Sequence, residues 1–135
     1  MDFTFTEEQQ MLLDTTRRFI ARDYSFETRR QRLATSGQAA DRKIWQGLAD
    51  LGLMALNVPE EHGGLGGNAV DTMLVMTALG EGLVLEPFLS SAVLSTRALA
   101  TMGSAAQQES MLPALAAGDT IVVFAHDEAA SRFDW

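Results

Sequence analysis

Cysteine is absent from the 135-residue sequence. A disulfide framework and a metal site built on thiolates are therefore excluded, and this composition is typical of proteins in a reducing cytoplasm. Long apolar runs are also missing, so no segment predicts a membrane-spanning helix. The sequence opens on Met1-Asp2-Phe3, without the basic and apolar stretches of a secretory signal. We therefore expect a cytoplasmic protein with no membrane insertion.

Positive charge is scarce. Ten Lys and Arg residues stand against 18 Asp and Glu residues, which gives a net charge of −8 at pH 7. This balance argues against nucleic acid as a partner. Eight of the ten basic residues lie between Arg17 and Lys43, where Asp23, Glu27 and Asp41 are interleaved. The mixture favours a solvated helix face over a partner-binding patch.

Apolar residues make up 47% of the chain and charged residues 21%, which predicts a folded globular protein. The length suits one domain with a hydrophobic core. Periodicity and end signals predict helices over most of the chain, namely over residues 7–23, 27–33, 42–51, 69–85 and 87–102, with a last helix after Ser104. The expected fold class is all-α, an up-and-down bundle of about five to six helices.

Helix-start signals precede several of these ranges. Thr6 and Ser104 are each followed three residues later by glutamine, which is the spacing of a capping box. Asn68 is a favourable N-cap residue. The ranges 69–85 and 87–102 carry very few charges, and helices that are apolar on most sides are buried on most sides. These two helices are therefore expected to form the centre of the domain.

Four of the 11 glycines fall within positions 63–67. Pro59 precedes them, and the apolar range 53–58 is expected to be extended as it leads to this proline. The glycines allow the positive φ angles that a folded helix–helix turn needs. A phosphate-binding loop is less favoured, because no Gly-Lys-Ser/Thr motif is present and no strand precedes Gly63.

One stretch, positions 120–125, is rich in β-branched and aromatic residues. It predicts a terminal β-strand after the turn at Gly118-Asp119. A single strand has unpaired edges, so the sequence indicates that a β-rich unit begins here. We expect a helical domain over residues 1–118 and the start of an incomplete β-domain over residues 119–135.

Residues with catalytic chemistry are few. The two histidines, His62 and His126, have no paired carboxylate at the spacing of a catalytic or metal site. Glu60 and Glu61 lie beside the glycine cluster and are expected to be structural or interface residues. We therefore assign no catalytic residue and expect no metal.

Four groups of residues carry a family resemblance: Phe5-Thr6-Glu7-Glu8-Gln9; Leu51-Gly52-Leu53 with Pro59-Glu60-Glu61-His62-Gly63-Gly64; Gly103-Ser104-Ala105-Ala106-Gln107 with Leu112-Pro113; and Gly118-Asp119 with the expected strand. In this order they resemble the first-helix start, the P-E-x-x-G-G loop, the next-to-last helix and the entry to the β-domain of the acyl-CoA dehydrogenase family. Each motif alone is a weak signal. Together they cover nearly the whole chain.

The resemblance implies a longer protein with an α-helical domain, a middle β-domain and a C-terminal helical bundle. Members of the family bind FAD, accept an acyl-CoA thioester and form a Cα=Cβ double bond. The resemblance also implies that the protein is a homo- or hetero-oligomer and that electron-transfer flavoprotein is its electron acceptor. The family's catalytic carboxylate lies in the C-terminal bundle, and nothing between Met1 and Trp135 matches it.

The resemblance also implies a flavin contact near the C-terminus. The family pattern there is aromatic-x-x-Thr-Glu-Pro-Gly-Ala-Gly-Ser-Asp, and the matching cofactor-binding positions are Phe124, Asp127 and Phe133. Asp127 stands where the family has threonine, and Arg132-Phe133 replaces Gly-Ser. These departures resemble the divergent subunits of two-component enzymes, of the pimeloyl-CoA dehydrogenase-like small-subunit type. The chain alone is therefore expected to bind FAD weakly or not at all.

In the family, the helix that matches 87–102 lines the acyl cavity. Phe88, Ser91 and Ser95 have the spacing i, i+3 and i+7, so they share one face of an α-helix. The resemblance implies that these three residues bind the acyl substrate. An alternative is that each serine hydroxyl bonds to the carbonyl four residues earlier, as is common for serines within helices.

Three functions remain open from the sequence. The first is the N-terminal domain of an acyl-CoA dehydrogenase, and the second is a non-catalytic helical subunit of a heteromeric dehydrogenase. The third is a small helical carrier for an apolar ligand, which has little support because uncharged helices are more often core.

Overall fold

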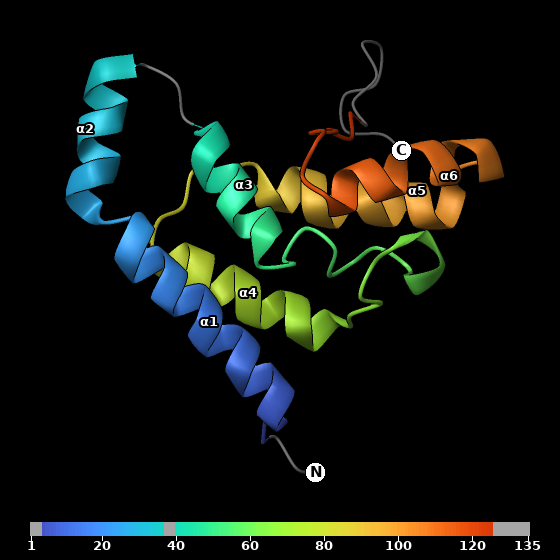
Figure 1. The fold of residues 1–135 in the computed structure, drawn as a ribbon, viewed down its shortest axis with the longest axis horizontal. Helices are drawn as coiled ribbons and strands as arrows, with labels where there is room; N and C mark the ends of the chain where they lie inside the picture. The colour runs from blue at the N-terminus through green and yellow to red at the C-terminus, as the bar shows by residue number, and fades with distance from the viewer. Residues whose placement is uncertain (1–3, 37–39, 126–135) are drawn as a thin grey trace, which may run out of the picture.

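The computed structural model describes residues 4–36 and 40–125, and it is all-helical in these ranges (Figure 1). The α-helices are α1 (Glu7–Asp23), α2 (Phe26–Ser36), α3 (Arg42–Asp50), α4 (Ala69–Glu81), α5 (Thr96–Met102) and α6 (Ala105–Ala116). A short 3-10 helix, η1 (Glu60–His62), and a π-helix, η2 (Leu89–Ser95), complete the described elements. The predicted all-α class is confirmed.

The helices gather in two groups (Figure 1). α1 packs along α4, while η2 and α5 continue as one helical rod beside α6. α3 lies between the two groups, and α2 projects at one end. None of the helices in the described ranges is long and apolar enough to cross a membrane.

The predicted helix starts are confirmed at three residues. Thr6 and Ser104 each accept a backbone N–H with their side chain, and the glutamine three residues further on accepts the N–H of the cap residue. Asn68 forms the same arrangement with Asp71, whose carboxylate accepts the Asn68 N–H at 2.8 Å. These caps satisfy N–H groups that the first helical turn leaves unpaired, and each contributes about 1 kcal/mol to stability.

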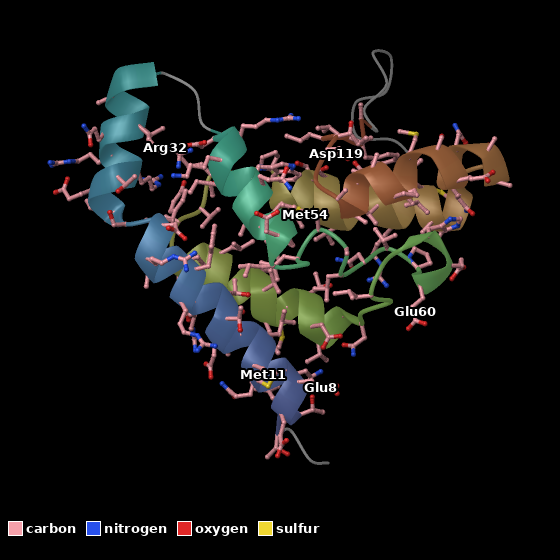
Figure 2. The ribbon with its side chains drawn as sticks, in the orientation of Figure 1. Glu8, Met11, Arg32, Met54, Glu60 and Asp119 are labelled. Carbon is pink, nitrogen blue, oxygen red and sulfur yellow. The ribbon has the colours of Figure 1, made fainter. Side chains whose placement is uncertain are left out.

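The main core lies where α1, α3 and α4 meet. Met54 and Val75 are completely buried there, and Figure 2 shows Met54 among the helices. A second, smaller cluster joins Val58 to Leu112 and Leu115 of α6. The α6 group is therefore attached to the domain through the residues that lead into the glycine cluster.

The apolar range 53–58 is not extended, so that prediction was wrong. It forms consecutive turns, in which the Ala55 N–H donates to the Gly52 carbonyl and the Val58 N–H donates to the Ala55 carbonyl, both at 3.1 Å. Gly52 has φ +77°, which reverses the chain after α3. The turns satisfy buried backbone groups that would otherwise need a neighbouring strand, and the described residues contain none.

The predicted strand at 120–125 was also wrong, because these residues carry no regular secondary structure. Strand preference reflects packing and pairing with a neighbouring strand, and no such neighbour exists within the described ranges. The segment instead lies against the helices, with Val122 beside the cluster of Val58 and α6.

The two nearly uncharged ranges are each buried on one face rather than on most sides. α4 buries Leu74 and Val75 but leaves Met73 49% exposed. In the second range, Ser91 and Ala92 are buried while Leu94 is 52% exposed. Both ranges therefore contribute to the core as predicted, and both also present apolar side chains at the surface of the chain.

Candidate functional site

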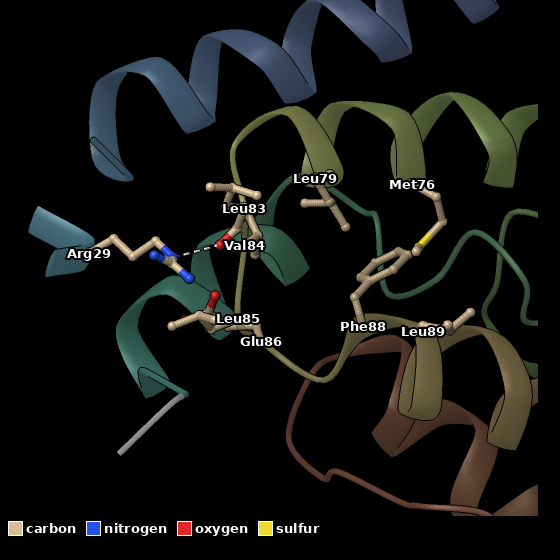
Figure 3. A pocket seen from close by; sticks show the side chains of 10 residues that line it. Arg29, Met76, Leu79, Leu83, Val84, Leu85, Glu86, Phe88 and Leu89 are labelled. Atoms are coloured by element: carbon tan, nitrogen blue, oxygen red, sulfur yellow. Dashed lines mark hydrogen bonds between the residues drawn. The ribbon is translucent and has the colours of Figure 1, made fainter. Parts of the chain in front are cut away.

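A cavity of about 360 Å³ opens between the end of α4 and the start of η2 (Figure 3). We name it the Phe88 cavity. Phe88, Leu79 and Glu86 are its buried residues, whereas Leu83 and Leu89 are about half exposed. Its lining comprises Arg29, Met76, Leu79, Gly80, Leu83, Val84, Leu85, Glu86, Phe88 and Leu89. The volume is within the range of small-molecule sites.

Side chains from the α1–α2 region hold residues 83–86, which form one wall of the Phe88 cavity. Arg29 Nε donates to the Leu83 carbonyl oxygen at 3.0 Å (Figure 3). The Leu85 N–H donates to the Tyr24 hydroxyl oxygen, also at 3.0 Å. Leu83 has φ +52°, a left-handed conformation that is strained for leucine. The two side-chain bonds therefore fix a turn that would otherwise relax.

A buried ion pair supports the same wall. The Glu86 side chain is fully buried, and its Oε1 lies 3.0 Å from Arg32 Nη2 and accepts the Asp41 N–H at 3.1 Å. Arg32 Nε lies 3.3 Å from the Asp41 carboxylate, and the Arg32 guanidinium stands 5.3 Å from the centre of the Tyr24 ring. One guanidinium therefore balances two carboxylates. The second oxygen of Glu86, Oε2, has no hydrogen-bond partner among the described residues.

Tyr24 is the single tyrosine of the chain and is 3% exposed. Burial raises the pKa of its phenol. The Leu85 N–H that it accepts lowers the pKa, the Glu86 carboxylate raises it, and the two neighbouring guanidinium groups lower it, with burial the largest effect. The phenol is therefore neutral at physiological pH and serves the wall as a hydrogen-bond acceptor.

Sequence reasoning missed the part that Arg29 and Arg32 play in this wall. The mixed charges of this region predicted a solvated face, and Arg22 and Arg30 do have side chains that are 75% and 70% exposed. Arg32 is only 19% exposed. Spacing is the signal that could have distinguished the wall arginines from the solvated ones, since Arg29 and Arg32 are three residues apart and share a helix face.

A second cavity, of about 250 Å³, lies between α5 and residues 122–124. We name it the Phe124 cavity. Its lining comprises Ser95, Ala98, Leu99, Met102, Gly103, Gln107, Val122, Val123 and Phe124. Phe124, a predicted cofactor residue, is 50% exposed beside this mainly apolar space. Asp127 and Phe133, the other two predicted cofactor residues, lie outside the described ranges.

The predicted substrate residues lie at different places relative to the two named cavities. Phe88 borders the Phe88 cavity and Ser95 borders the Phe124 cavity, whereas Ser91 borders neither of these two. All three side chains are buried, with exposures of 2%, 2% and 0% for Phe88, Ser95 and Ser91. Ser91 and Ser95 lie within the π-helix η2, whose hydrogen bonds span five residues instead of four, and Phe88 lies just before it.

Neither serine hydroxyl bonds to the carbonyl four residues earlier, the alternative that the sequence left open. Ser95 Oγ donates to the Ser90 carbonyl oxygen at 2.7 Å, five residues earlier, as the π-helical repeat favours. Ser91 Oγ instead accepts the N–H of Val122 at 3.2 Å. The Ser91 hydroxyl thus reaches a segment far along the chain.

The glycine cluster forms a packed turn between helices. A Cβ atom on Gly64 would lie 1.9 Å from the Val58 carbonyl oxygen, and one on Gly67 would lie 2.8 Å from the Leu56 carbonyl oxygen. The Gly66 N–H donates to Val58 at 3.0 Å and the Gly67 N–H donates to Leu56 at 2.7 Å. These N–H groups are already bonded within the chain, which supports the helix–helix turn over a phosphate-binding loop.

The acidic and histidine side chains beside the glycine turn, on η1, form no metal-binding group. Glu60 and Glu61 are exposed on η1, and Figure 2 shows Glu60 at the edge of the molecule. Across residues 4–36 and 40–125, no group of three or more His, Asp or Glu side chains could hold a metal ion. His126 lies outside these residues.

Comparison with known proteins identifies the fold. Residues 6–119 match the family described as acyl-CoA dehydrogenase, N-terminal domain. The acyl-CoA dehydrogenase FadE27 of Mycobacterium tuberculosis is 35% identical over 127 residues, which cover 94% of this chain and 34% of FadE27. A chain of the ChsE4-ChsE5 complex from Mycobacterium tuberculosis has a TM-score of 0.83 and 34% identity, over 91% of this chain and 34% of that chain.

A more distant structure, an acyl-CoA dehydrogenase complexed with FAD from Bacillus anthracis, has a TM-score of 0.65 and 22% identity, over 87% of this chain and 20% of that chain. At this identity the likeness shows the fold alone. The present chain spans about a third of the length of FadE27. Because the family match extends over residues 6–119, the chain belongs to the acyl-CoA dehydrogenase family, in the region of its N-terminal domain.

Proposed function

We propose that the chain is the N-terminal helical domain of a flavin-dependent acyl-CoA dehydrogenase, which introduces a Cα=Cβ double bond into an acyl-CoA thioester. The observation that carries this proposal is the family match over residues 6–119, together with the identity to FadE27 over 94% of the chain. Residues 1–118 would form the helical domain, and residues 119–135 would lead into the next one. We assign no catalytic base to these 135 residues.

The Phe124 cavity supports a contact with the flavin. Phe124 is half exposed beside apolar side chains, an environment that suits the edge or face of a planar aromatic group. We propose that Phe124, Asp127 and Phe133 contact FAD in the complete protein. FAD, when bound, would accept the hydride that leaves the β-carbon of the substrate. The isolated 135-residue chain would bind FAD weakly or not at all.

The helical rod of η2 and α5 is the part of the chain that we propose to border the acyl group. The Phe88 cavity and the Phe124 cavity lie towards the two ends of η2, beside Phe88 and Ser95. An acyl group that followed the rod would pass between them. Phe88, Ser91 and Ser95 therefore remain our candidate substrate-binding residues, with Ser91 buried between the other two.

A second candidate function is a non-catalytic helical subunit of a heteromeric acyl-CoA dehydrogenase. The similarity to a chain of the ChsE4-ChsE5 complex favours this candidate, because that structure contains two differently named subunits. Asp127, in place of the family's threonine, fits a subunit with an incomplete site. In either case we propose a homo- or hetero-oligomer that passes electrons to electron-transfer flavoprotein.

The test is to purify the full-length protein, both alone and after co-expression with a candidate partner subunit. Acyl-CoA is then added under anaerobic conditions, and the flavin absorbance is recorded. Loss of the oxidised flavin absorbance in the protein alone would support the enzyme. Loss only with the partner present would support the helical subunit. Both candidates would be refuted if neither preparation contained flavin. They would also be refuted if flavin were present but none of the acyl-CoA substrates lowered its absorbance.

A further inference from the structure

A hydroxyl in η2 holds the segment of chain that leaves the helical domain. Ser91 is completely buried, and its Oγ accepts the N–H of Val122 at 3.2 Å. The two residues are 31 positions apart in the sequence. Val122 lies two residues before Phe124, which is half exposed beside the Phe124 cavity. The bond therefore connects a helix that borders both cavities to a segment that borders one of them.

The Ser91 hydroxyl oxygen has two lone pairs and can therefore accept this bond, and the carbonyl to which a serine in a helix commonly donates is occupied. The Pro87 carbonyl, four residues earlier, already accepts the Ser91 N–H at 2.9 Å and the Ser90 hydroxyl at 3.2 Å. Two further hydroxyls stabilise the wide turn, since Ser95 donates to the Ser90 carbonyl and Thr96 donates to the Ser91 carbonyl at 3.1 Å. A carbonyl oxygen has two lone pairs, so Pro87 has no further acceptor position for Ser91.

The same segment is fixed upstream by side chains of α3. Trp45 Nε1 donates to the Gly118 carbonyl oxygen at 3.0 Å in a buried position. Arg42 Nη2 donates to the Asp119 carbonyl oxygen at 3.2 Å. These bonds hold the turn after α6, and the Ser91 hydroxyl holds the chain three residues beyond it. Side chains thus supply the anchoring that a neighbouring strand would otherwise give.

We propose that Ser91 is a positioning residue for the flavin site. Its hydroxyl oxygen holds the Val122 backbone, and this fixes where Phe124 is presented to the cofactor. The bond also couples η2, along which the acyl group would lie, to the flavin-contacting segment. This inference rests on the proposed function, and it assigns Ser91 an effect on the flavin in addition to any contact with the acyl group.

The test uses the full-length protein with Ser91→Ala, which removes the acceptor with little change of shape. Amide hydrogen exchange at Val122 is expected to rise about fivefold or more, since this partly buried amide no longer has its partner. The dissociation constant for FAD is expected to rise by a similar factor. The melting temperature is recorded in parallel, so that general destabilisation is measured separately.

Thr16→Val is the matched control. Thr16 is also completely buried, and its hydroxyl donates to the Leu12 carbonyl at 2.8 Å within α1. The control also loses a buried hydroxyl, but its bond lies within α1 and involves neither η2 nor the segment around Val122. We expect it to leave Val122 exchange and FAD affinity at the wild-type values, even where the melting temperature falls.

Val122→Pro removes the N–H donor from the other side of the bond. This variant tests the same interaction if Ser91→Ala folds poorly. FAD affinity should fall in this variant too, and the double variant should bind FAD within about twofold of Val122→Pro alone, as expected for one shared interaction. Unchanged Val122 exchange in Ser91→Ala, unchanged FAD affinity, or fully additive losses would overturn the positioning role. A wild-type protein that binds no FAD, either alone or with its partner subunit, would overturn the proposed function as well.

Discussion

The guanidinium of Arg32 lies 3.0 Å from the carboxylate of Glu86, a residue 54 positions further along the chain. The Glu86 side chain is completely buried and that of Arg32 is 19% exposed. This pair, with the Arg29 bond to Leu83, ties α2 to the wall of the Phe88 cavity. Figure 2 shows Arg32 on the side of α2 that faces the rest of the molecule.

Replacing Arg32 is expected to destabilise the domain strongly. Arg32→Met leaves the buried Glu86 carboxylate without its counter-charge, and breaking one side of a buried pair costs about 3–5 kcal/mol. Urea unfolding measures the loss. The control is Arg17→Met, which breaks the exposed pair with Glu81 and should change stability little. Equal effects of the two variants would contradict the prediction.

The double replacement Arg32→Met with Glu86→Leu should recover much of the stability lost in Arg32→Met. It removes the buried carboxylate together with its partner, and apolar side chains that replace a whole buried pair are often tolerated. Urea unfolding of the double variant, compared with both single variants, gives the coupling between the two residues. A double variant no more stable than Arg32→Met alone would speak against an electrostatic origin.

Tyr24 should make the domain's stability fall at alkaline pH. Burial raises the pKa of its phenol, so the folded protein holds the phenolic proton more tightly than the unfolded chain. Its contribution is complete below the unfolded pKa of about 10 and is lost as pH rises through the folded value. Phenolate absorbance of the 135-residue chain should therefore titrate above pH 10. Tyr24→Phe should lack this part of the pH dependence, and a phenolate midpoint at or below 10 would contradict the prediction.

Two adjacent glycines should respond very differently to alanine. Gly64→Ala places a Cβ 1.9 Å from the Val58 carbonyl oxygen, so the packed turn must move, and we expect a loss of about 3 kcal/mol or more. Gly63 has φ +81° but an open surrounding, so Gly63→Ala should lose only about 1–2 kcal/mol from backbone strain. Thermal unfolding distinguishes them. The reverse order would mean that the turn is not held by close packing.

Trp45→Phe should weaken the attachment of the turn after α6. The variant keeps an aromatic ring but leaves the buried Gly118 carbonyl without its indole donor, which costs about 1–3 kcal/mol. Gln46→Ala is the control, because its bond to the Ala117 carbonyl is exposed and should matter less. Urea unfolding of the two variants checks the order. A smaller effect for Trp45→Phe would place the main anchor elsewhere.

Local signals in the sequence were sufficient for the helices. The caps at Thr6, Asn68 and Ser104 depend on residues within three positions, and these starts are confirmed. The strand expected at 120–125 was wrong because strand formation depends on a neighbour, and local propensity carries no information about one. The prediction that range 53–58 is extended was wrong for a similar reason. Burial against the core and the turn at Gly52 decide its conformation, and neither can be read from local propensity.

The candidate site was less accessible to sequence reasoning. Its residues come together from distant positions: Tyr24 bonds to Leu85, and Ser91 bonds to Val122. Helical spacing placed Phe88, Ser91 and Ser95 on one face, and all three are buried, but it could not foresee the π-helix η2, in which Ser95 bonds to the Ser90 carbonyl. The resemblance to the family drew attention to Phe124, which borders the Phe124 cavity, and its contact with a cofactor stays a prediction.

The π-helical stretch holds one residue more in its turn than an α-helix would need. Deleting one residue within η2 should therefore let the wide turn close to an α-helical turn, so that α5 keeps its direction and its packing against α6. In the α-helix α5, by contrast, each residue turns the chain by about 100°, so a one-residue deletion before Leu99 would rotate the rest of the rod by that angle and take Leu99 out of the cluster around Val58. A single-codon deletion should thus be tolerated in η2 and disruptive in α5.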